Sequence, residues 1–426
     1  MNETVTKLVD IVFRDTERTE EVQILYEQVR MDCQERFEDL IRNGMDEDEA
    51  IAAVVESLKG MEEVLKDYPL RKTEEVASEE KKVAQPSQSR IDLPKDAIES
   101  IHVTVYSHDV YILRSKDEKV HVYTEAKEIA IHSENHAICV EEKKVNLNKK
   151  EFFFSILRMH NLPDEPLYIE IPEKNSLSAD ISAGIGEIFW EGAELGSAML
   201  KTTSGDIHLK GQECHIGKME IRSTSGDVHL HDDADADEMI ISTTSGDIRG
   251  SVQCGRMEAH TVSGDMAIHG KARELHADTL SGELELSGTY DTAWCKSMSG
   301  DLDIDAACND MLAVSTSGDI HLSGKNHTVK MQSTSGDIIT TVRTKEIQCT
   351  TTSGDVEMNV RESEELERVS AETRSGDVQV LLPKNQSYRV HMNTNSGDSS
   401  ARVTESLDED APDVDVRSVS GDIRIQ

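Results

Sequence analysis

The sequence is poor in positive charge, in aromatic residues and in proline. Its 426 residues include 45 Lys and Arg against 83 Asp and Glu, which gives a net charge of −38. Proteins bind nucleic acids and anionic lipid surfaces through basic footprints, so we expect neither as a partner. The same charge favours cationic peptides, basic proteins or metal ions.

The sequence also lacks paired cysteines and long apolar runs. Its seven cysteines contain no Cys-x-x-Cys motif, and such a scattered, odd-numbered set is typical of a reducing compartment. The first residues have no apolar signal region, and no stretch approaches the roughly 18 apolar residues of a transmembrane helix. We therefore expect a cytoplasmic protein with no membrane span, the alternative being leaderless export to the cell surface.

What the sequence has in abundance is one short motif, Ser-Gly followed by an acidic residue, which occurs twelve times. From Gly246 to Gly354 the motif returns every 18 residues, and elsewhere the spacing is 20 to 24 residues. A fixed period of this size indicates stacked supersecondary units. The glycines, which we expect at structural turns, are Gly205, Gly226, Gly246, Gly264, Gly282, Gly300, Gly318, Gly336, Gly354, Gly376, Gly397 and Gly421.

Apolar residues flank each of these glycines with a period of two. Around Gly226, for example, they are Met219, Ile221, Val228 and Leu230. This alternation predicts a half-buried strand on each side of the turn. We expect a mainly β protein, a parallel β-solenoid of about 12 to 13 coils with two short strands each. A meander of hairpins or a propeller is the alternative architecture.

Two further positions of the repeat carry structural expectations. The residue three before each glycine is always Ser or Thr, which predicts an inward-facing ladder of hydroxyls bonded to one another or to the backbone. The glycine itself is expected to need a positive φ. No Phe follows Phe189, which suggests an interior too narrow for aromatic rings.

Residues 1–69 are predicted to form a small helical domain, because apolar residues recur at helical spacing from Glu21 to Asn43 and from Glu47 to Leu58. The run from Glu35 to Ala50 resembles the HAAS signalling domain, and the resemblance covers residues 20–68. It implies a regulatory or envelope-signalling context. The helical pattern itself is that of a module that docks a partner helix. The alternative is a helical hairpin that only buries its own apolar stripe. Residues 70–90, charged and then polar, are expected to be a linker.

Residues 91–190 alternate like strands but lack the regular motif, so we expect irregular N-terminal coils and a cap, followed by the regular solenoid over residues 191–426. Ile101-x-Val-x-Val, Leu167-x-Ile-x-Ile-Pro and the repeated Thr-x-Ser-Gly-Asp resemble the bacterial putative-adhesin family of β-strand repeats. The resemblance covers residues 91–426. Through LiaX-like members it implies a link to cell-envelope stress, and it brings no catalytic residues.

The chain stops on a strand-like segment, Asp422 to Gln426, with no capping element after it. An uncovered terminal coil exposes unpaired backbone groups. We therefore expect this end to dock on another copy of the chain, giving a homo-oligomer, or on a partner.

The acidic residue after each glycine raises the question of metal binding. One carboxylate per coil resembles calcium-binding nonapeptide solenoids, although those carry denser Gly-rich turns. We expect these side chains to bond backbone amides at the turn, with weak cation binding as the alternative. His208, His229 and His321 occupy the same outward-facing position of the repeat. Because no carboxylate or Cys accompanies them, we expect these imidazoles to be solvated. The candidate carboxylates are Asp206, Asp227, Asp247, Asp265, Asp301, Asp319, Asp337 and Asp355.

No motif in the sequence indicates catalysis. There is no Gly-x-Ser-x-Gly elbow, P-loop or dinucleotide fingerprint, and the insertions at residues 361–368 and 404–413 are acidic without His. We expect a non-enzymatic scaffold, without a cofactor, that presents an acidic repeat surface to a protein, a cationic peptide or a cell-envelope partner. The alternatives are a surface adhesin-like protein and a polysaccharide-active β-helix enzyme.

Overall fold

The computed structural model describes residues 89–143, 165–173, 175–210 and 215–426, together with six isolated helical positions nearer the N-terminus. The rest of the predicted helical domain (1–69), and the predicted linker up to residue 88, lie outside the described residues, so the helical domain stays a prediction. Within the described part no helix has the length and apolar character to cross a membrane. The six isolated positions are Tyr26, Val29, Arg30, Cys33, Arg36 and Phe37.

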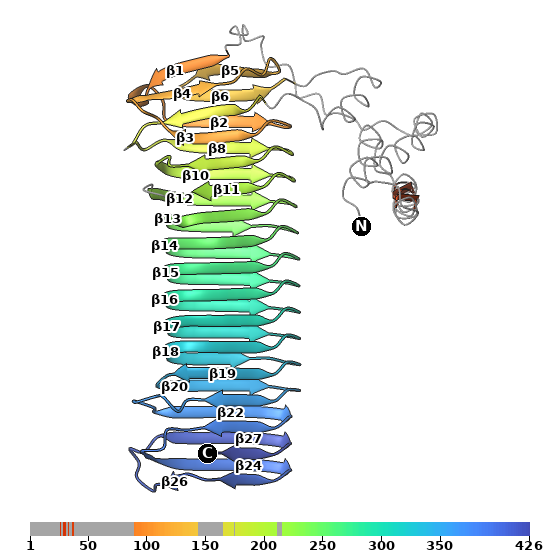
Figure 1. The fold of residues 1–426 in the computed structure, drawn as a ribbon, viewed down its shortest axis with the longest axis vertical. Helices are drawn as coiled ribbons and strands as arrows, with labels where there is room; N and C mark the ends of the chain where they lie inside the picture. The colour runs from red at the N-terminus through yellow and green to blue at the C-terminus, as the bar shows by residue number, and fades with distance from the viewer. Residues whose placement is uncertain are drawn as a thin grey trace. The chain divides into compact units, whose positions relative to one another are not determined.

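The first strands form an irregular section at one end of the sheet (Figure 1). β1 pairs antiparallel with β4, β4 with β7, and β5 with β6. β2 and β3 already pair in parallel with β8 and β9, where the coils begin. The elements are β1 (Arg90–Pro94), η1 (Lys95–Ala97), β2 (Ser100–Val105), β3 (Val110–Arg114), β4 (Lys119–Tyr123), β5 (Ile129–Glu134), β6 (Ala137–Glu142), β7 (Leu167–Ile171), β8 (Ser178–Ala183) and β9 (Ile188–Glu191).

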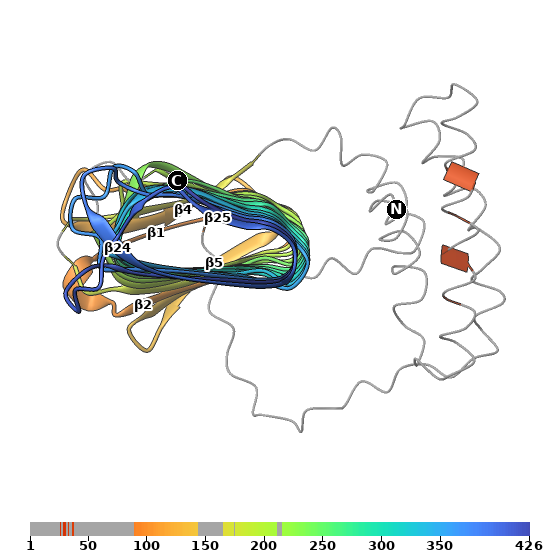
Figure 2. The ribbon, with the colours of Figure 1, turned by 90° about the horizontal axis from the view of Figure 1, so that it is seen from below.

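From β10 onward the strands stack in parallel into a β-solenoid, which confirms the predicted architecture. The 18-residue period is the stacking register, so Met266, Leu284 and Leu302 lie side by side on successive coils. Seen end-on, the coils superimpose in a flattened outline (Figure 2). The strands are β10 (Leu195–Thr202), β11 (Ile207–Lys210), β12 (His215–Ser223), β13 (Val228–Ser242), β14 (Ile248–Thr261), β15 (Met266–Thr279), β16 (Leu284–Ser297), β17 (Leu302–Ser315), β18 (Ile320–Gln332), β19 (Ile338–Arg343), β20 (Glu346–Thr351), β21 (Val356–Asn359), β22 (Arg368–Ser375) and β23 (Val378–Leu381).

The middle coils differ from the prediction of two short strands each. β13 to β18 are 13–15 residues long, because one bent strand runs from a Ser-Gly-acidic corner around the opposite edge to the next corner. The positive φ angles also lie at that opposite edge. Gly270, Gly288 and Gly324, each six residues after a corner glycine, have φ of 120°, 133° and 126°.

The corner glycines themselves do not have positive φ, so that prediction is wrong and another constraint applies. A Cβ on any of the twelve would lie only 1.8–2.1 Å from the carbonyl oxygen of the glycine one coil away. Heavy atoms cannot approach this closely, so only glycine allows the corners to stack at the strand spacing of about 4.8 Å.

The Ser or Thr three residues before each corner glycine faces inward, as predicted. Ser333 shows the arrangement: its Oγ accepts the Gly336 N–H at 2.9 Å and donates to the Gly318 carbonyl oxygen of the preceding coil at 3.3 Å. The hydroxyl therefore ties one corner to the next. The residues of this set that are at most 7% exposed are Thr202, Ser223, Thr243, Thr261, Thr279, Ser297, Ser315, Ser333, Thr351, Thr373 and Ser418.

The interior is aliphatic along its length, but it does hold aromatic rings, contrary to the prediction. Trp190, Tyr290 and Tyr388 are at most 2% exposed. Each donates a hydrogen bond from its polar tip to a backbone carbonyl oxygen 2.7–3.0 Å away. A ring is therefore accepted where its nitrogen or hydroxyl finds an acceptor within the coil.

The last coil in the sequence is not the last coil in space (Figure 1). β27 pairs in parallel with β22 on one side and with β24 on the other, so Val414 lies between Val369 and Val390. β28 lies in the same way between β23 and β25. The prediction of an uncovered C-terminal strand is wrong, because the open edge belongs to β24, which β26 covers only at two residues. Self-association through this end stays a prediction. The strands are β24 (Ser387–Ser396), β25 (Ser399–Ala401), β26 (Thr404–Glu405), β27 (Asp413–Ser420) and β28 (Ile423–Ile425).

Replacing a corner glycine is expected to destabilise the solenoid strongly. In Gly300→Ala the new Cβ would lie 1.8 Å from the Gly282 carbonyl oxygen, and we expect a loss of about 3 kcal/mol from forced separation of the coils. Urea unfolding measures the change, with the exposed neighbour Ser299→Ala as the control. An unchanged unfolding midpoint for Gly300→Ala would contradict the packing role of the corner.

The inserted C-terminal coil can be tested by cross-linking outward-facing positions. Arg417 lies beside Glu372 on one neighbouring strand and beside Asn393 on the other. Cysteines at 372 and 417, or at 393 and 417, should form disulfides, whereas cysteines at 372 and 393 are two strand spacings apart, about 10 Å, and should not. Peptide mapping by mass spectrometry identifies the bonds. A 372–393 disulfide would show that the coils stack in sequence order.

Candidate functional site

The acidic residues of the corners form a hydrogen-bonded ladder along one edge of the solenoid. Where the corner residue one coil away is an Asp, its Oδ1 accepts the backbone N–H of the next acidic residue, as Asp301 does from Asp319 at 2.8 Å. The amide dipoles offset the repulsion between stacked carboxylates. All eight candidate carboxylates belong to this corner ladder, with bonds of 2.7–3.0 Å: Asp206, Asp227, Asp247, Asp265, Asp301, Asp319, Asp337 and Asp355.

Exposed apolar side chains gather on three successive corners. Val262, Leu280 and Met298 each stand two residues before a corner glycine and are 42%, 41% and 49% exposed. The next two coils have Thr316 and Thr334 at this position. Because the coils are stacked in register, the three side chains form one row beside exposed carboxylates. We call this surface the corner ridge; it comprises Val262, Leu280 and Met298 with Asp265, Glu283 and Asp301.

A column of stacked rings runs along the outer face near the N-terminal end of the solenoid. Successive ring centroids are 4.6–5.4 Å apart, because the rings occupy one register position on neighbouring strands. Arg90 lies over the first ring, 4.9 Å from its centroid, as a cation–π contact. In order, the rings are Tyr123, Tyr168, Tyr111, Phe189, His208 and His229.

Two imidazoles and a carboxylate converge at the last two steps of this column. The rings of His208 and His229 stack with centroids 4.8 Å apart, and the ligating atoms of both lie within 4.8 Å of one another and of an Asp206 carboxylate oxygen. Among the side chains that the structure describes, no other group of three or more His, Cys, Asp or Glu residues has its ligating atoms this close together. The prediction that no carboxylate accompanies these histidines is therefore wrong.

The surroundings of His208 favour the neutral ring. Partial burial lowers the pKa of His208, and the neighbouring His229 lowers it further. Glu187, one coil earlier, places Oε2 3.5 Å from His208 Nε2. His321, by contrast, has no second imidazole beside it and pairs with Asp303 at 3.1 Å.

A protein-family model described as Toastrack DUF4097 matches residues 98–306 and 269–426. The chain belongs to the toastrack DUF4097 family. The predicted β-strand-repeat fold is confirmed by this match and by the strand pairing. The match begins at residue 98, so the HAAS-like resemblance gains no support from it. No curated protein matches the chain.

Two solved structures are similar to parts of the toastrack chain. A putative cell adhesion protein from Clostridium sporogenes ATCC 15579 is 7% identical, with 79% of this chain and 96% of that chain covered and a TM-score of 0.17. A putative adhesin from Parabacteroides merdae ATCC 43184 is 12% identical, with coverage of 69% and 95% and a TM-score of 0.27. At these values the likeness carries no conclusion about function.

The acidic insertion of the toastrack domain at residues 361–368 lies near an open hollow of about 470 Å³, which Lys325, Arg343 and Arg361 help to line. Glu362 pairs with Arg343, and Glu365 lies 2.8 Å from the Lys345 amine. These insertion carboxylates are thus paired with cations. The arrangement differs from that of a glycosidase, in which two catalytic carboxylates flank the bond that is cleaved.

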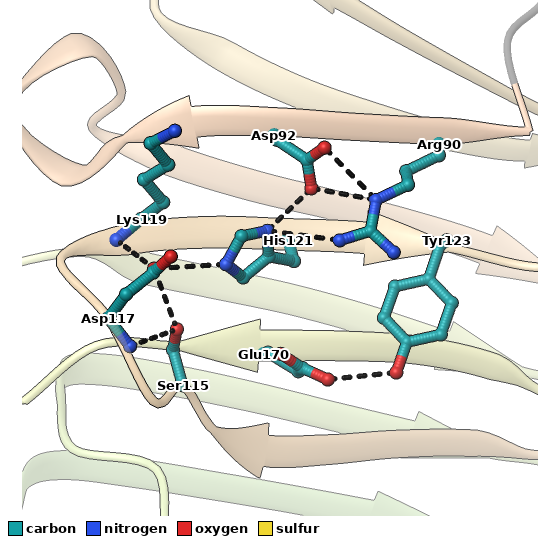
Figure 3. Close-up of polar contacts among 8 residues, drawn as sticks. All are labelled: Arg90, Asp92, Ser115, Asp117, Lys119, His121, Tyr123 and Glu170. Carbon is teal, nitrogen blue, oxygen red and sulfur yellow. Dashed lines mark hydrogen bonds and ion pairs between the residues drawn. The ribbon is translucent and has the colours of Figure 1, made fainter.

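Near the N-terminal end of the toastrack domain, His121 lies between two carboxylates (Figure 3). Its Nδ1 is 2.5 Å from Asp92 and its Nε2 is 3.0 Å from Asp117. Burial alone would lower the pKa of His121, but the bonds to both carboxylates outweigh it and raise the pKa. The bond from Arg90, followed by that from His121, lowers the pKa of Asp92 to about 2. This cluster ties β1 to β4.

The cluster predicts that the pairing of β1 with β4 is firmest at mildly acidic pH. The contribution of Asp92 is lost as pH falls from its ordinary pKa of 3.8 toward about 2, and that of His121 is lost as pH rises through its raised pKa. NMR titration of the His121 ring measures this directly. In Asp92→Asn the pKa of His121 should fall, and an unchanged value would refute the coupling.

Proposed function

We propose that the toastrack domain is a non-catalytic binding scaffold, and that its corner ridge takes a cationic segment of a protein or peptide. The observation that carries the proposal is the row of Val262, Leu280 and Met298, each more than 40% exposed, beside a row of carboxylates. Exposed apolar side chains that line up on successive coils are typical of interaction sites rather than of a solvated edge.

The spacing of the ridge defines what fits it. Three coils at about 4.8 Å place its apolar side chains over roughly 10 Å, and the carboxylates repeat at the same interval. A segment with apolar and basic side chains on one face can therefore contact both rows at once. Attraction between the net charge of −38 and a cationic segment would also accelerate its association.

The absence of a catalytic role is part of the proposal. It is supported by His121, whose two nitrogens both face carboxylates, and by Glu362 and Glu365, which are paired with cations. A cell-envelope setting, a regulator docked by residues 1–69, and an adhesin-like role at the cell surface are extensions that rest on resemblance. The docking of a regulator by residues 1–69 can be tested by comparing the partners captured by the full chain with those captured by a chain that lacks residues 1–70.

The ridge proposal predicts binding of a labelled amphipathic peptide of Lys and Leu, measured by fluorescence anisotropy. Replacing Val262, Leu280 and Met298 together by Ser should weaken binding about tenfold or more, because apolar contacts at the centre of an interface contribute most of its affinity. The matched control is Ile339→Ser, which removes an equally exposed apolar side chain, 42%, away from the ridge. Equal affinity of all three proteins would exclude the ridge as the binding site.

The charge contribution can be separated without breaking the ladder. The triple variant Asp265→Asn, Glu283→Gln, Asp301→Asn removes three charges, while each Asn keeps an Oδ1 that can accept the amide of the next coil. We expect weaker binding and a shallower salt dependence. A peptide with Glu in place of Lys should not bind, and if it did the acidic row would have no role.

A further inference from the structure

We infer that Asp206, His208 and His229 form a binding site for a divalent transition-metal ion, with zinc as the preferred ion. Two imidazole nitrogens and a carboxylate oxygen are a donor set that zinc takes in proteins, usually with a fourth ligand. Calcium and magnesium prefer sites made only of oxygen ligands. The site is therefore distinct in its chemistry from the rest of the corner ladder, which offers carboxylates alone.

The geometry brings the donors together from two adjacent coils. Asp206 and His208 come from the corner and strand β11, and His229 from β13, where it is the direct register partner of His208. All three ligating atoms lie within 4.8 Å of one another. A tetrahedral zinc ion with ligands at about 2.1 Å needs donors roughly 3.4 Å apart. Rotation of these half-buried side chains can close the difference.

The immediate surroundings favour an ion at this place. Asp206 Oδ1 is held by the Asp227 N–H at 2.8 Å, which orients the carboxylate, as supporting hydrogen bonds do for metal ligands. Glu187, 3.5 Å from His208 Nε2, is a further donor within reach.

The site is confined to one step of the solenoid. One coil further along, the register partner of His229 is Arg249, a cation paired with Asp247. One coil earlier, the partner of His208 is Phe189, which cannot ligate. An ion bound here would join the coil of β11 to the coil of β13 and stabilise their stacking.

The experiment uses the full chain, stripped of metal, and titrates it with Co²⁺ followed by visible absorption and with Zn²⁺ followed by calorimetry. We expect one equivalent of Co²⁺ to bind and to give the intense visible bands of low-coordinate cobalt. Zn²⁺ should displace this Co²⁺, whereas Ca²⁺ should not. The bound ion should raise the melting temperature of the protein.

The variants keep the ring column intact. His208→Phe preserves stacking on Phe189, and His229→Phe preserves stacking on His208. Each variant removes one ligand and should abolish binding of the one equivalent. Asp206→Asn keeps the acceptor for the Asp227 amide and should lower the affinity roughly tenfold or more, since a charged ligand becomes neutral. His321→Phe removes an exposed imidazole of the same phase elsewhere and should leave binding unchanged.

A second measurement needs no variant. Zinc should protect His208 and His229, and leave His321 unprotected, when the wild-type chain is modified by diethyl pyrocarbonate and its peptides are mapped by mass spectrometry. Retention of the equivalent in both Phe variants, or equal modification of all three histidines with and without zinc, would overturn the site.

Discussion

The contact between corner glycines is the constraint on which the rest of the solenoid depends. Because each corner lies against the carbonyl oxygen of the next, a Cβ at any of the twelve positions would force the coils apart. This contact sets the coil spacing at the edge. The inward hydroxyl of Ser333 and the side chain of Asp319 then bond across a gap of fixed width. The aliphatic columns are held in register by the same spacing.

Much of this architecture could be predicted from the sequence, because a period of 18 residues and an alternation of two are direct consequences of stacked strands. The inward Ser and Thr residues followed from the same pattern. The role of the corner glycine did not, since a glycine that permits close approach and one that adopts positive φ look alike in sequence. Gly282 has the close contact without a positive φ, whereas Gly288, only six residues later, has both.

The order of the last coils could not be predicted for a related reason. The coils around Gly376, Gly397 and Gly421 carry the same motif, so any of them can pair with any other in register. The pairing of Val414 with both Val369 and Val390 depends on the loop at residues 402–412, which is long enough to lead the chain back. The sequence also did not predict the histidine site, for a more local reason. Alignment of His208 with His229 follows from the period, but the approach of Asp206 depends on the shape of the corner.

Stacking also determines where this molecule can vary. The interior and the corner glycines are fixed by packing, so chemical differences between coils are confined to outward positions, and each such position is repeated at the strand spacing. Two or three substitutions at the same repeat position on successive coils therefore lie side by side as a row. Val262, Leu280 and Met298 form an apolar row. His208 and His229 form an imidazole pair that lies between Phe189 and Arg249 along the stack, with the ring of His231 beside both. In a fold with such short turns, the binding chemistry is carried by rows on the coils instead of by loops.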